Sequence, residues 1–332
     1  MQPREIVRRT LEFDHPPRVP RQVWLLPWAE LHHPAEVEDI RTRFPDVIVG
    51  CPSFLREEPP SRGDRYAVGT SVDEWGCEFH NLEAGIIGEV KRPQLTDWAD
   101  VDRVRVPREC LTVDLEKVEE FCRATDRFVL AGCCPRIFEQ LQFIRGTEDL
   151  LCDLVDPPPE LETLLRRMHE FYLEQIHLWG KTSVDGIMMM DDWGSQQSLL
   201  ISPRMWRRMF RPLYEEYFRT ARDYGKYVFF HSDGHVLDVV PDLVELGVHA
   251  LNSQVFAMGV EEMGARFAGR LTFWGDFDRQ HLLPHGSPAD IVAAARRMRE
   301  HLYRDGGVIA QTEFGPGSRP ENVRTYLEYW DA

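Results

Sequence analysis

The sequence predicts an α/β protein, a (β/α)8 barrel with a hairpin insertion near its N-terminus. Eight short apolar runs, rich in β-branched and aromatic residues, are spread along 332 residues, and helical patterns separate the last six. This alternation in a chain of this length fits a closed barrel better than an open doubly wound sheet, which is the alternative topology. The expected strands are VPRQVW, VIVG, FVLAG, GIMMM, YVFFH, ALNSQ, LTFWG and VIAQT.

The first third of the chain is expected to supply two strands and the insertion. An amphipathic helix with apolar positions from Ile6 to Phe13 precedes the first strand, and residues 34–44 have a helical pattern before the second. Residues 52–110 differ, because their glycine-punctuated runs of alternating polarity are typical of hairpins. We interpret residues 1–332 as a single domain with an insertion at about 52–110.

From residue 111 onward the alternation of helix and strand is regular. Helical patterns cover residues 115–125, a long stretch ending near Lys181, residues 288–302 and a final segment that starts at Pro320. The best-marked helix is expected to run from Pro203 to Gly225, with Ser202 as its N-cap and an apolar stripe along one side. Between YVFFH and ALNSQ, apolar residues recur at helical spacing up to Gly247, which predicts a βαβ unit.

Composition excludes several classes of partner. A formal charge of −16 disfavours nucleic acid and anionic membranes, because both would be repelled. The sequence has no run of 18 apolar residues, and its start carries charges where a signal peptide needs an apolar region, so we expect a cytoplasmic protein. All seven cysteines lie between Cys51 and Cys152 and are expected to be reduced thiols.

Polar residues stand where the predicted strands end. In a barrel of parallel strands these carboxyl ends converge on one mouth, which is the edge where ligands bind. Such polar residues are unusual in an apolar core, because an ionised carboxylate there must be paired, solvated or bound to a metal. The strand-end residues are Asp191, Asp192, His231, Asp233, Asn252, Asp276 and Glu313.

Several carboxylates around one histidine are compatible with two kinds of chemistry. Histidine with two or three carboxylates is a usual ligand set for zinc, iron or manganese, so we expect His231, Asp233 and Glu313 to bind a divalent metal. Carboxyl groups with raised pKa values used for acid/base work are the alternative. A structural, hydrogen-bonded His231 among solvated carboxylates would need no ion. The candidate catalytic residues are Asp191, Asp192, Asn252 and Asp276.

Six segments of the chain occur in a characteristic order and spacing: REIVRRTLEFDHPPRVP, DEWGCEF, DDWGSQQSLLISPRMWRRMFRP, YVFFHSDGHVLDVVPDLVELGVHALNSQ, FWGDFD and VIAQTEFGPGSRPENV. In these segments the chain resembles the uroporphyrinogen decarboxylase superfamily, which also contains cobamide-dependent methyltransferases. The resemblance covers nearly the whole length. It implies a (β/α)8 barrel with its pocket at the carboxyl ends of the strands, and a homodimer.

Two departures from the superfamily's patterns bear on the implied function. Decarboxylases carry an arginine-rich loop of the type RQAGRYLPEY after the first strand, whereas this chain has QVWLLPWAEL. The methyltransferase branch binds zinc through His-x-Cys and a later cysteine; here His231, Asp233 and about Glu313 take these positions. Histidine with carboxylates makes a harder ion than thiolates do, which suits an oxygen-linked methyl group better than a thiol.

The resemblance therefore implies a metal-dependent methyltransferase that moves a methyl group between a small, oxygen-linked methyl substrate and a corrinoid. The DxHxxG signature of a corrinoid-binding domain is missing, so the corrinoid is expected on a separate partner protein. Zinc is the expected metal, with iron or manganese as alternatives. A metal-independent decarboxylase of a tetrapyrrole or other carboxylate substrate, and a non-catalytic ligand-binding barrel, are the alternative functions.

Overall fold

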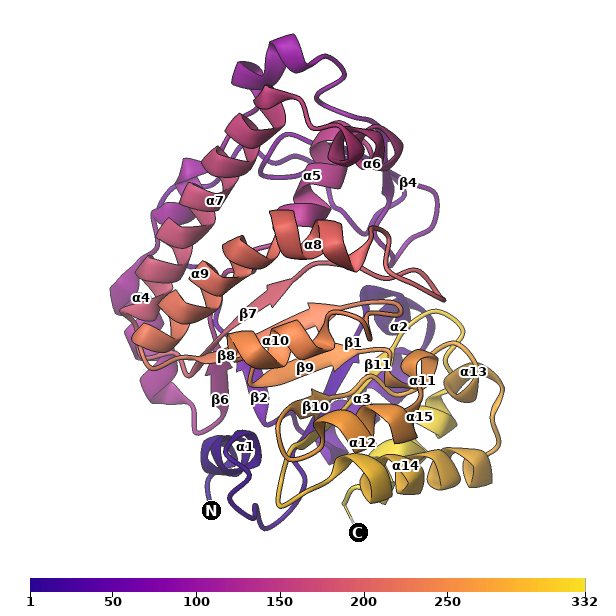
Figure 1. The fold of residues 1–332 in the computed structure, drawn as a ribbon. Coiled ribbons are helices and arrows are strands. Elements are labelled where there is room, and N and C mark those ends of the chain that lie inside the picture. Colours follow the sequence, from indigo (N-terminus) through magenta and orange to yellow (C-terminus); the bar gives the residue numbers. More distant parts are fainter. Residues whose placement is uncertain (332) are drawn as a thin grey trace.

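Eight parallel strands surrounded by helices form a nearly closed barrel (Figure 1). The computed structural model describes residues 1–331. Neighbouring strands follow the order β1-β11-β10-β9-β8-β7-β6-β2, so the predicted (β/α)8 barrel and all eight predicted strands are confirmed. The strands are β1 (Arg21–Leu25), β2 (Ile48–Gly50), β6 (Phe128–Leu130), β7 (Gly186–Met190), β8 (Tyr227–Ser232), β9 (Ala250–Ser253), β10 (Thr272–Trp274) and β11 (Val308–Phe314).

The seam of the barrel lies between β1 and β2, the two ends of the sheet. The backbone N–H of Val47 donates to the carbonyl of Arg21 at 3.4 Å. The N–H of Val23 donates to Asp46 Oδ1 at 2.8 Å, so a side-chain carboxylate takes the place of a strand-to-strand carbonyl. Burial raises the pKa of Asp46 from 3.8 to about 6, although Val23 and nearby arginines oppose this shift.

We expect ionised Asp46 to lower stability at neutral pH. Because folding raises its pKa, the folded state binds this proton more tightly, so stability falls as pH rises from about 4 to 6 and then levels off. Asp46→Asn keeps the acceptor and removes the charge. Its free energy of unfolding in urea should exceed the wild-type value by about 1–2 kcal/mol at pH 8 and match it near pH 4. A difference that does not change with pH would contradict this account.

Helix α1 (Pro3–Leu11) covers the amino end of the barrel (Figure 1). Its buried face packs against the strand starts, and its arginines reach Asp185, which directly precedes β7 and is 2% exposed in its side chain. Asp185 lies 3.0 Å from Arg4 Nε and 2.7 Å from Arg8 Nη2. The N–H of Val129 also donates to Asp185, at 2.9 Å. One buried carboxylate therefore ties α1 to two strands.

Most predicted helices are confirmed with bounds shifted by a residue or two. The helices outside the insertion are α2 (Pro27–His32), α3 (Pro34–Arg43), α4 (Leu115–Ala124), α5 (Ile137–Arg145), α6 (Thr147–Val155), α7 (Pro159–Gly180), α8 (Pro203–Met209), α9 (Arg211–Asp223), α10 (Val240–Leu246), α11 (Val255–Met258), α12 (Val260–Phe267), α13 (Leu282–His285), α14 (Pro288–Leu302) and α15 (Pro320–Tyr329). None of the helices in this described range has the length and apolar character needed to span a membrane.

The single helix predicted from Pro203 to Gly225 is wrong, because α8 ends at Met209 and α9 begins at Arg211, with Phe210 between them. Pro212 explains the break: proline has no N–H to donate, and its ring clashes with the carbonyl four residues earlier in a continuous helix. The predicted N-cap is confirmed, since Ser202 accepts a hydrogen bond from the N–H of Met205 at 3.2 Å.

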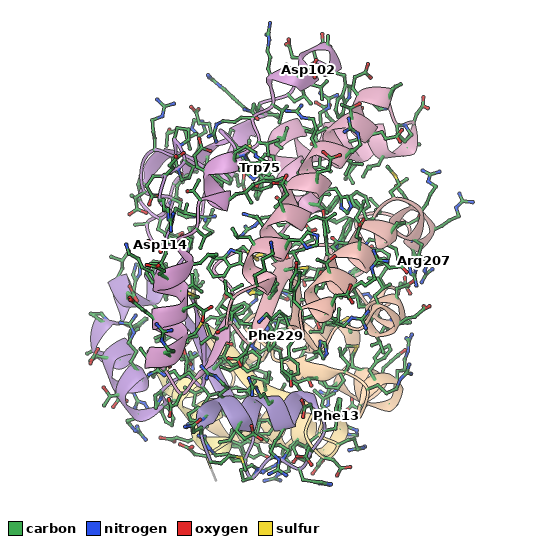
Figure 2. All side chains as sticks on the ribbon, turned by 90° about the vertical axis from the view of Figure 1, so that its left-hand side faces the viewer. Phe13, Trp75, Asp102, Asp114, Arg207 and Phe229 are labelled. Carbon is green, nitrogen blue, oxygen red and sulfur yellow. The ribbon has the colours of Figure 1, made fainter. Side chains whose placement is uncertain are left out.

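The segment between β2 and β6 contains a separate three-stranded antiparallel sheet, as expected for the hairpin insertion. Its elements are β3 (Gly69–Val72), β4 (Glu78–Asn81), β5 (Glu89–Arg92) and the 3-10 helices η1 (Trp98–Arg103) and η2 (Arg108–Leu111). This part rises beyond the barrel together with α5, α6 and the start of α7 (Figure 1). In Figure 2, Asp102 lies at its far end and Trp75 lies between it and the barrel residue Phe229.

Candidate active site

His231 stands near the carboxyl end of β8 and is 6% exposed. Its Nδ1 lies 2.6 Å from Asn252 Oδ1. The amide of Asn252 is oriented by two hydrogen bonds that its Nδ2 donates, to the carbonyl of Trp274 and to Gln311 Oε1 at 3.0 Å. Asn252 must therefore accept the proton on Nδ1 of His231, so in the neutral imidazole the Nε2 lone pair is available to bind a ligand.

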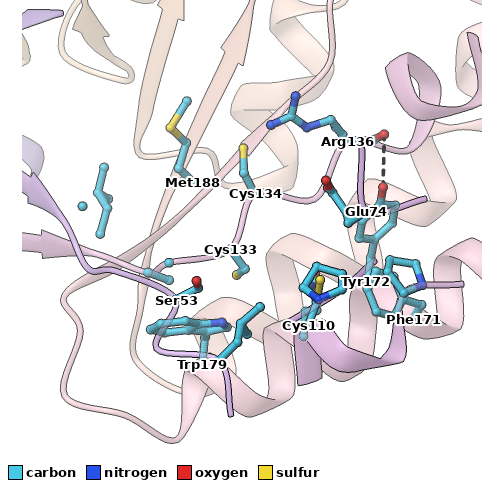
Figure 3. A pocket seen from close by; sticks show the side chains of 18 of the residues that line it. Ser53, Glu74, Cys110, Cys133, Cys134, Arg136, Phe171, Tyr172, Trp179 and Met188 are labelled. Atoms are coloured by element: carbon cyan, nitrogen blue, oxygen red, sulfur yellow. Dashed lines mark hydrogen bonds between the residues drawn. The ribbon is translucent and has the colours of Figure 1, made fainter. Parts of the chain in front are cut away.

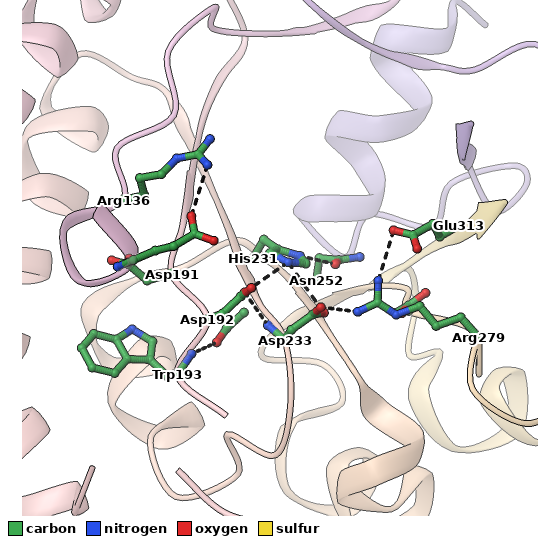
Figure 4. Close-up of polar contacts among 12 residues, drawn as sticks. Arg136, Asp191, Asp192, Trp193, His231, Asp233, Asn252, Arg279 and Glu313 are labelled. Atoms are coloured by element: carbon green, nitrogen blue, oxygen red, sulfur yellow. Dashed lines mark hydrogen bonds and ion pairs between the residues drawn. The ribbon is translucent and has the colours of Figure 1, made fainter. Parts of the chain in front are cut away.

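Two carboxylates face Nε2 of His231 (Figure 4). Asp192 Oδ1 lies 3.5 Å and Asp233 Oδ1 lies 3.7 Å from this nitrogen. The N–H of Asp233 donates to Asp192 Oδ1 at 3.0 Å, which joins the residues that follow β7 and β8. Two tetrahedral ligands at 2.0–2.1 Å from zinc are about 3.3 Å apart. Small side-chain shifts would therefore bring these three groups to metal-binding distances.

Arg279 is paired with three carboxylates, one of which belongs to Asp233 (Figure 4). Its Nη2 contacts Asp233, and its Nε lies 3.3 Å from Asp276 Oδ2. Its Nη1 donates to Glu313 Oε2 at 3.1 Å. With Asp192, four carboxylates share one guanidinium and one histidine. A divalent cation would neutralise the excess negative charge, so the residues present fit such an ion.

Burial and neighbouring charges shift the pKa values of this cluster. Burial alone would lower the pKa of His231, but Asp192 and Asp233 reverse this effect and raise the pKa to about 9. Burial raises the pKa of Asp276 well above its usual range. It also raises the pKa of Glu313, although the charge of Arg279 opposes that shift. Metal binding would therefore release the proton that His231 holds at neutral pH.

Asp191 belongs to a different network from its neighbour Asp192. Fully buried, it accepts hydrogen bonds from the N–H of Glu139 at 2.7 Å and from the hydroxyl of Tyr214. The indole N–H of Trp193 donates to the same hydroxyl at 3.0 Å. Burial raises the pKa of Asp191 to about 8, which these hydrogen bonds oppose. Asp191 thus ties the end of β7 to α5 and α9, and it positions the turn that carries Asp192.

The structure brings most of the predicted site residues together. Asp192, His231, Asp233 and Asn252 are in direct contact. Asp276 and Glu313 join them only through Arg279, and Glu313 lies outside the group of three whose ligand atoms are all within 4.8 Å of one another. The sequence analysis missed Arg279, for which the available signal is a basic residue directly after the strand-end motif FWGDFD.

Figure 3 shows a cavity of about 640 Å³ whose lining does not include Asp192, His231 or Asp233. Barrel side chains, α7 and the insertion all contribute to its lining. Trp24 connects the cavity to the cluster, because its ring centroid lies 5.5 Å from that of His231. Cys133 and Cys134 also line the cavity; burial raises the pKa of Cys134 to about 11 and that of Cys133 well above its usual value. Neither cysteine belongs to the group of three residues whose ligand atoms converge.

Comparisons with known proteins agree with this architecture. Residues 69–332 match the model of a family described as uroporphyrinogen decarboxylase (URO-D). Comparison with curated proteins finds no match. A solved structure of a methyltransferase from Methanosarcina mazei is similar over 100% of this chain and 98% of its own, with a TM-score of 0.68 and 15% identity. At that identity the similarity shows the fold alone.

A second solved structure is similar at a lower level. It is a glycosylated endo-β-1,4-xylanase of glycoside hydrolase family 10 from Gloeophyllum trabeum. The similarity covers 97% of this chain and 99% of the xylanase, with a TM-score of 0.48 and 9% identity. We base no argument on it.

Proposed function

The chain belongs to the uroporphyrinogen decarboxylase family, and from this premise we propose that it is a metal-dependent methyltransferase. It would move a methyl group between a small, oxygen-linked methyl substrate and a corrinoid carried by a separate protein. The observation that supports this most is the group of Asp192, His231 and Asp233, which Trp24 connects to a large cavity. The similar structure described as a methyltransferase favours this activity within the family.

We propose that Asp192, His231 and Asp233 hold the divalent cation, with zinc as the expected metal and iron or manganese as alternatives. When bound, such an ion would supply Lewis-acid polarisation of the oxygen that carries the methyl group. Glu313 is the third ligand predicted from the sequence. Asp192 is the better-placed donor, because it lies 3.5 Å from His231 Nε2 whereas Glu313 lies outside the group of three. Glu313 would instead hold Arg279 against Asp233.

Residues around the proposed metal ligands would orient these ligands and transfer a proton. Asn252 keeps His231 in the tautomer with a free Nε2, and Arg279 fixes one oxygen of Asp233. In the transfer, the methyl group leaves without the electron pair of its bond to oxygen, and the oxygen keeps that pair and takes up a proton. Asp276 is our candidate carrier of this proton, since burial raises its pKa and its Oδ1 has no hydrogen-bond partner.

The cavity offers little to a substrate with many carboxylates. Arg136 is the only arginine or lysine among the described residues that line it. Each further carboxylate buried there without a partner would cost several kcal/mol. Decarboxylation of uroporphyrinogen, which carries eight carboxylates, therefore receives no support from this site.

Metal content and its link to activity test the proposal. Elemental analysis by mass spectrometry should find about one divalent ion per chain in protein purified without chelator. Methyl transfer from a panel of aliphatic and aromatic methyl ethers to free cob(I)alamin, followed anaerobically, should cease after chelation and return with zinc, iron(II) or manganese. Wild-type protein that stays metal-free after incubation with each of these ions would refute the proposal and favour acid/base chemistry.

A further inference from the structure

Six aromatic side chains line the large cavity. Figure 3 labels three of them, Phe171, Tyr172 and Trp179. The rings of Trp75 and Phe171 meet edge to face with centroids 5.4 Å apart and an interplanar angle of 89°. Trp24 and Trp274 pack in the same way, at 5.4 Å and 87°. Walls of this kind match a ligand with a planar apolar ring. The aromatic lining residues are Trp24, Trp75, Phe171, Tyr172, Trp179 and Trp274.

Arg136 supplies the positive charge of the cavity, and its side chain interacts with the Cys134 thiol and with Glu139. Its Nη1 donates to Glu139 Oε2 at 3.1 Å, whereas neither Nε nor Nη2 donates to an oxygen of residues 1–331. The side chain is 25% exposed and borders the cavity (Figure 3). Nε and Nη2 form one edge of a guanidinium, and such an edge binds a carboxylate through two parallel hydrogen bonds.

Glu74 limits the charge that the cavity accepts. It is the single carboxylate among the described lining residues, and its charge acts on Arg136. One anionic group on a ligand can pair with the free edge of Arg136, but a second would meet Glu74 without a cation to offset it. The volume of about 640 Å³ is ample for a ligand of one or two fused rings.

From these walls and charges we infer that the cavity binds an aromatic monocarboxylate, with its ring between the aromatic side chains and its carboxylate on Arg136. As the substrate class of methyl transfer, this inference rests on the proposed function. As a binding site, it needs neither the metal nor the corrinoid. A ligand stacked on Trp24 would lie one ring away from His231, next to the group proposed to hold the metal.

Calorimetric titration of metal-depleted protein with 2-naphthoate and its neutral analogue 2-naphthamide tests the inference. We expect naphthoate to bind one molecule per chain, at least about tenfold more tightly than naphthamide. Arg136→Gln should weaken naphthoate binding about tenfold or more and leave naphthamide binding unchanged. Glu74→Gln should strengthen naphthoate binding, because it removes a repulsive charge. Arg166→Gln, at an exposed pair with Glu170 on α7, is the matched control and should change nothing.

Three results would overturn the inference: no binding of naphthoate to the wild type, equal binding of the acid and the amide, or full naphthoate affinity in a folded Arg136→Gln. If that variant does not fold, Arg136→Lys keeps the charge but loses the two-bond edge, so it should bind naphthoate more weakly than the wild type does. Equal affinity in Arg136→Lys would overturn the inference as well.

Metal analysis of the same samples separates the two proposals. A chain that binds naphthoate but takes up no divalent ion would refute the proposed methyl transfer and leave the carboxylate site in place. A chain that holds metal but does not bind naphthoate would refute the carboxylate site alone.

Discussion

Replacing His231 by alanine is expected to lower the affinity for a divalent metal by about 100-fold or more. The loss of a residue that merely orients a ligand typically costs 10–100-fold, and His231 supplies the single nitrogen of the proposed ligand set. The two carboxylates left behind would face each other with Arg279 as their main counter-charge. Competition against a chelator of known affinity, followed by elemental analysis, measures the change.

Further variants test which groups complete the proposed metal site. Asp192→Asn and Asp233→Asn should each lose metal, because an amide oxygen is a weaker ligand than a carboxylate. The Cys133→Ser/Cys134→Ser double variant should retain it. Glu313→Gln separates the two accounts: we expect it to keep its metal, whereas loss as severe as in Asp192→Asn would favour Glu313 as the third ligand. Stoichiometric metal in His231→Ala would contradict the site altogether.

Replacing Asp185 by alanine is expected to reduce the free energy of unfolding by about 3 kcal/mol. The substitution removes both ion pairs with α1 and leaves the N–H of Val129 without its acceptor inside the barrel wall. Arg4 and Arg8 are 25% and 44% exposed, so water recovers part of their loss. Urea-induced unfolding followed by circular dichroism measures the difference.

An exposed ion pair between the same helix and the turn that follows it supplies the comparison. Arg9 and Asp14 lie 2.8 Å apart, with Asp14 60% exposed. Asp14→Ala should change stability by no more than about 0.5 kcal/mol, since exposed pairs contribute little. A loss below about 1 kcal/mol in Asp185→Ala, or equal losses in both variants, would show that α1 is held by its apolar face instead.

The strands could be predicted from the sequence because each is a short apolar run set off by helices. In YVFFH, burial on both sides of the sheet leaves a continuous apolar pattern, and β8 appears there with one residue added. The helix from Pro203 to Gly225 failed as a prediction because an apolar stripe persists across a break. Periodicity reports which side of a segment is buried, whereas Pro212 removes one hydrogen bond and redirects the axis without disturbing that pattern.

The site was predictable as far as strand ends determine it. His231, Asp233 and Asn252 lie at or directly after the ends of the adjacent strands β8 and β9, so topology alone brings them close. The same reasoning does not distinguish Asp191 from Asp192. Neighbouring residues at a strand end point to opposite sides, and strand order does not show which of the two faces His231. The pairing of Glu313 with Arg279 depends on the conformation of the loop after β10, which has no repeating pattern in the sequence.

The residues of the insertion that line the cavity form its roof. This roof and the proposed metal ligands come from separate stretches of the chain. Glu74, Trp75 and Cys110 belong to the insertion, whereas Asp192, His231 and Asp233 lie at the carboxyl ends of β7 and β8. Mutations in the roof can therefore accumulate without moving the ligands. Proteins with this fold can therefore evolve to bind different molecules while the proposed metal site stays the same. Exchanging the insertion between relatives is a direct way to alter selectivity.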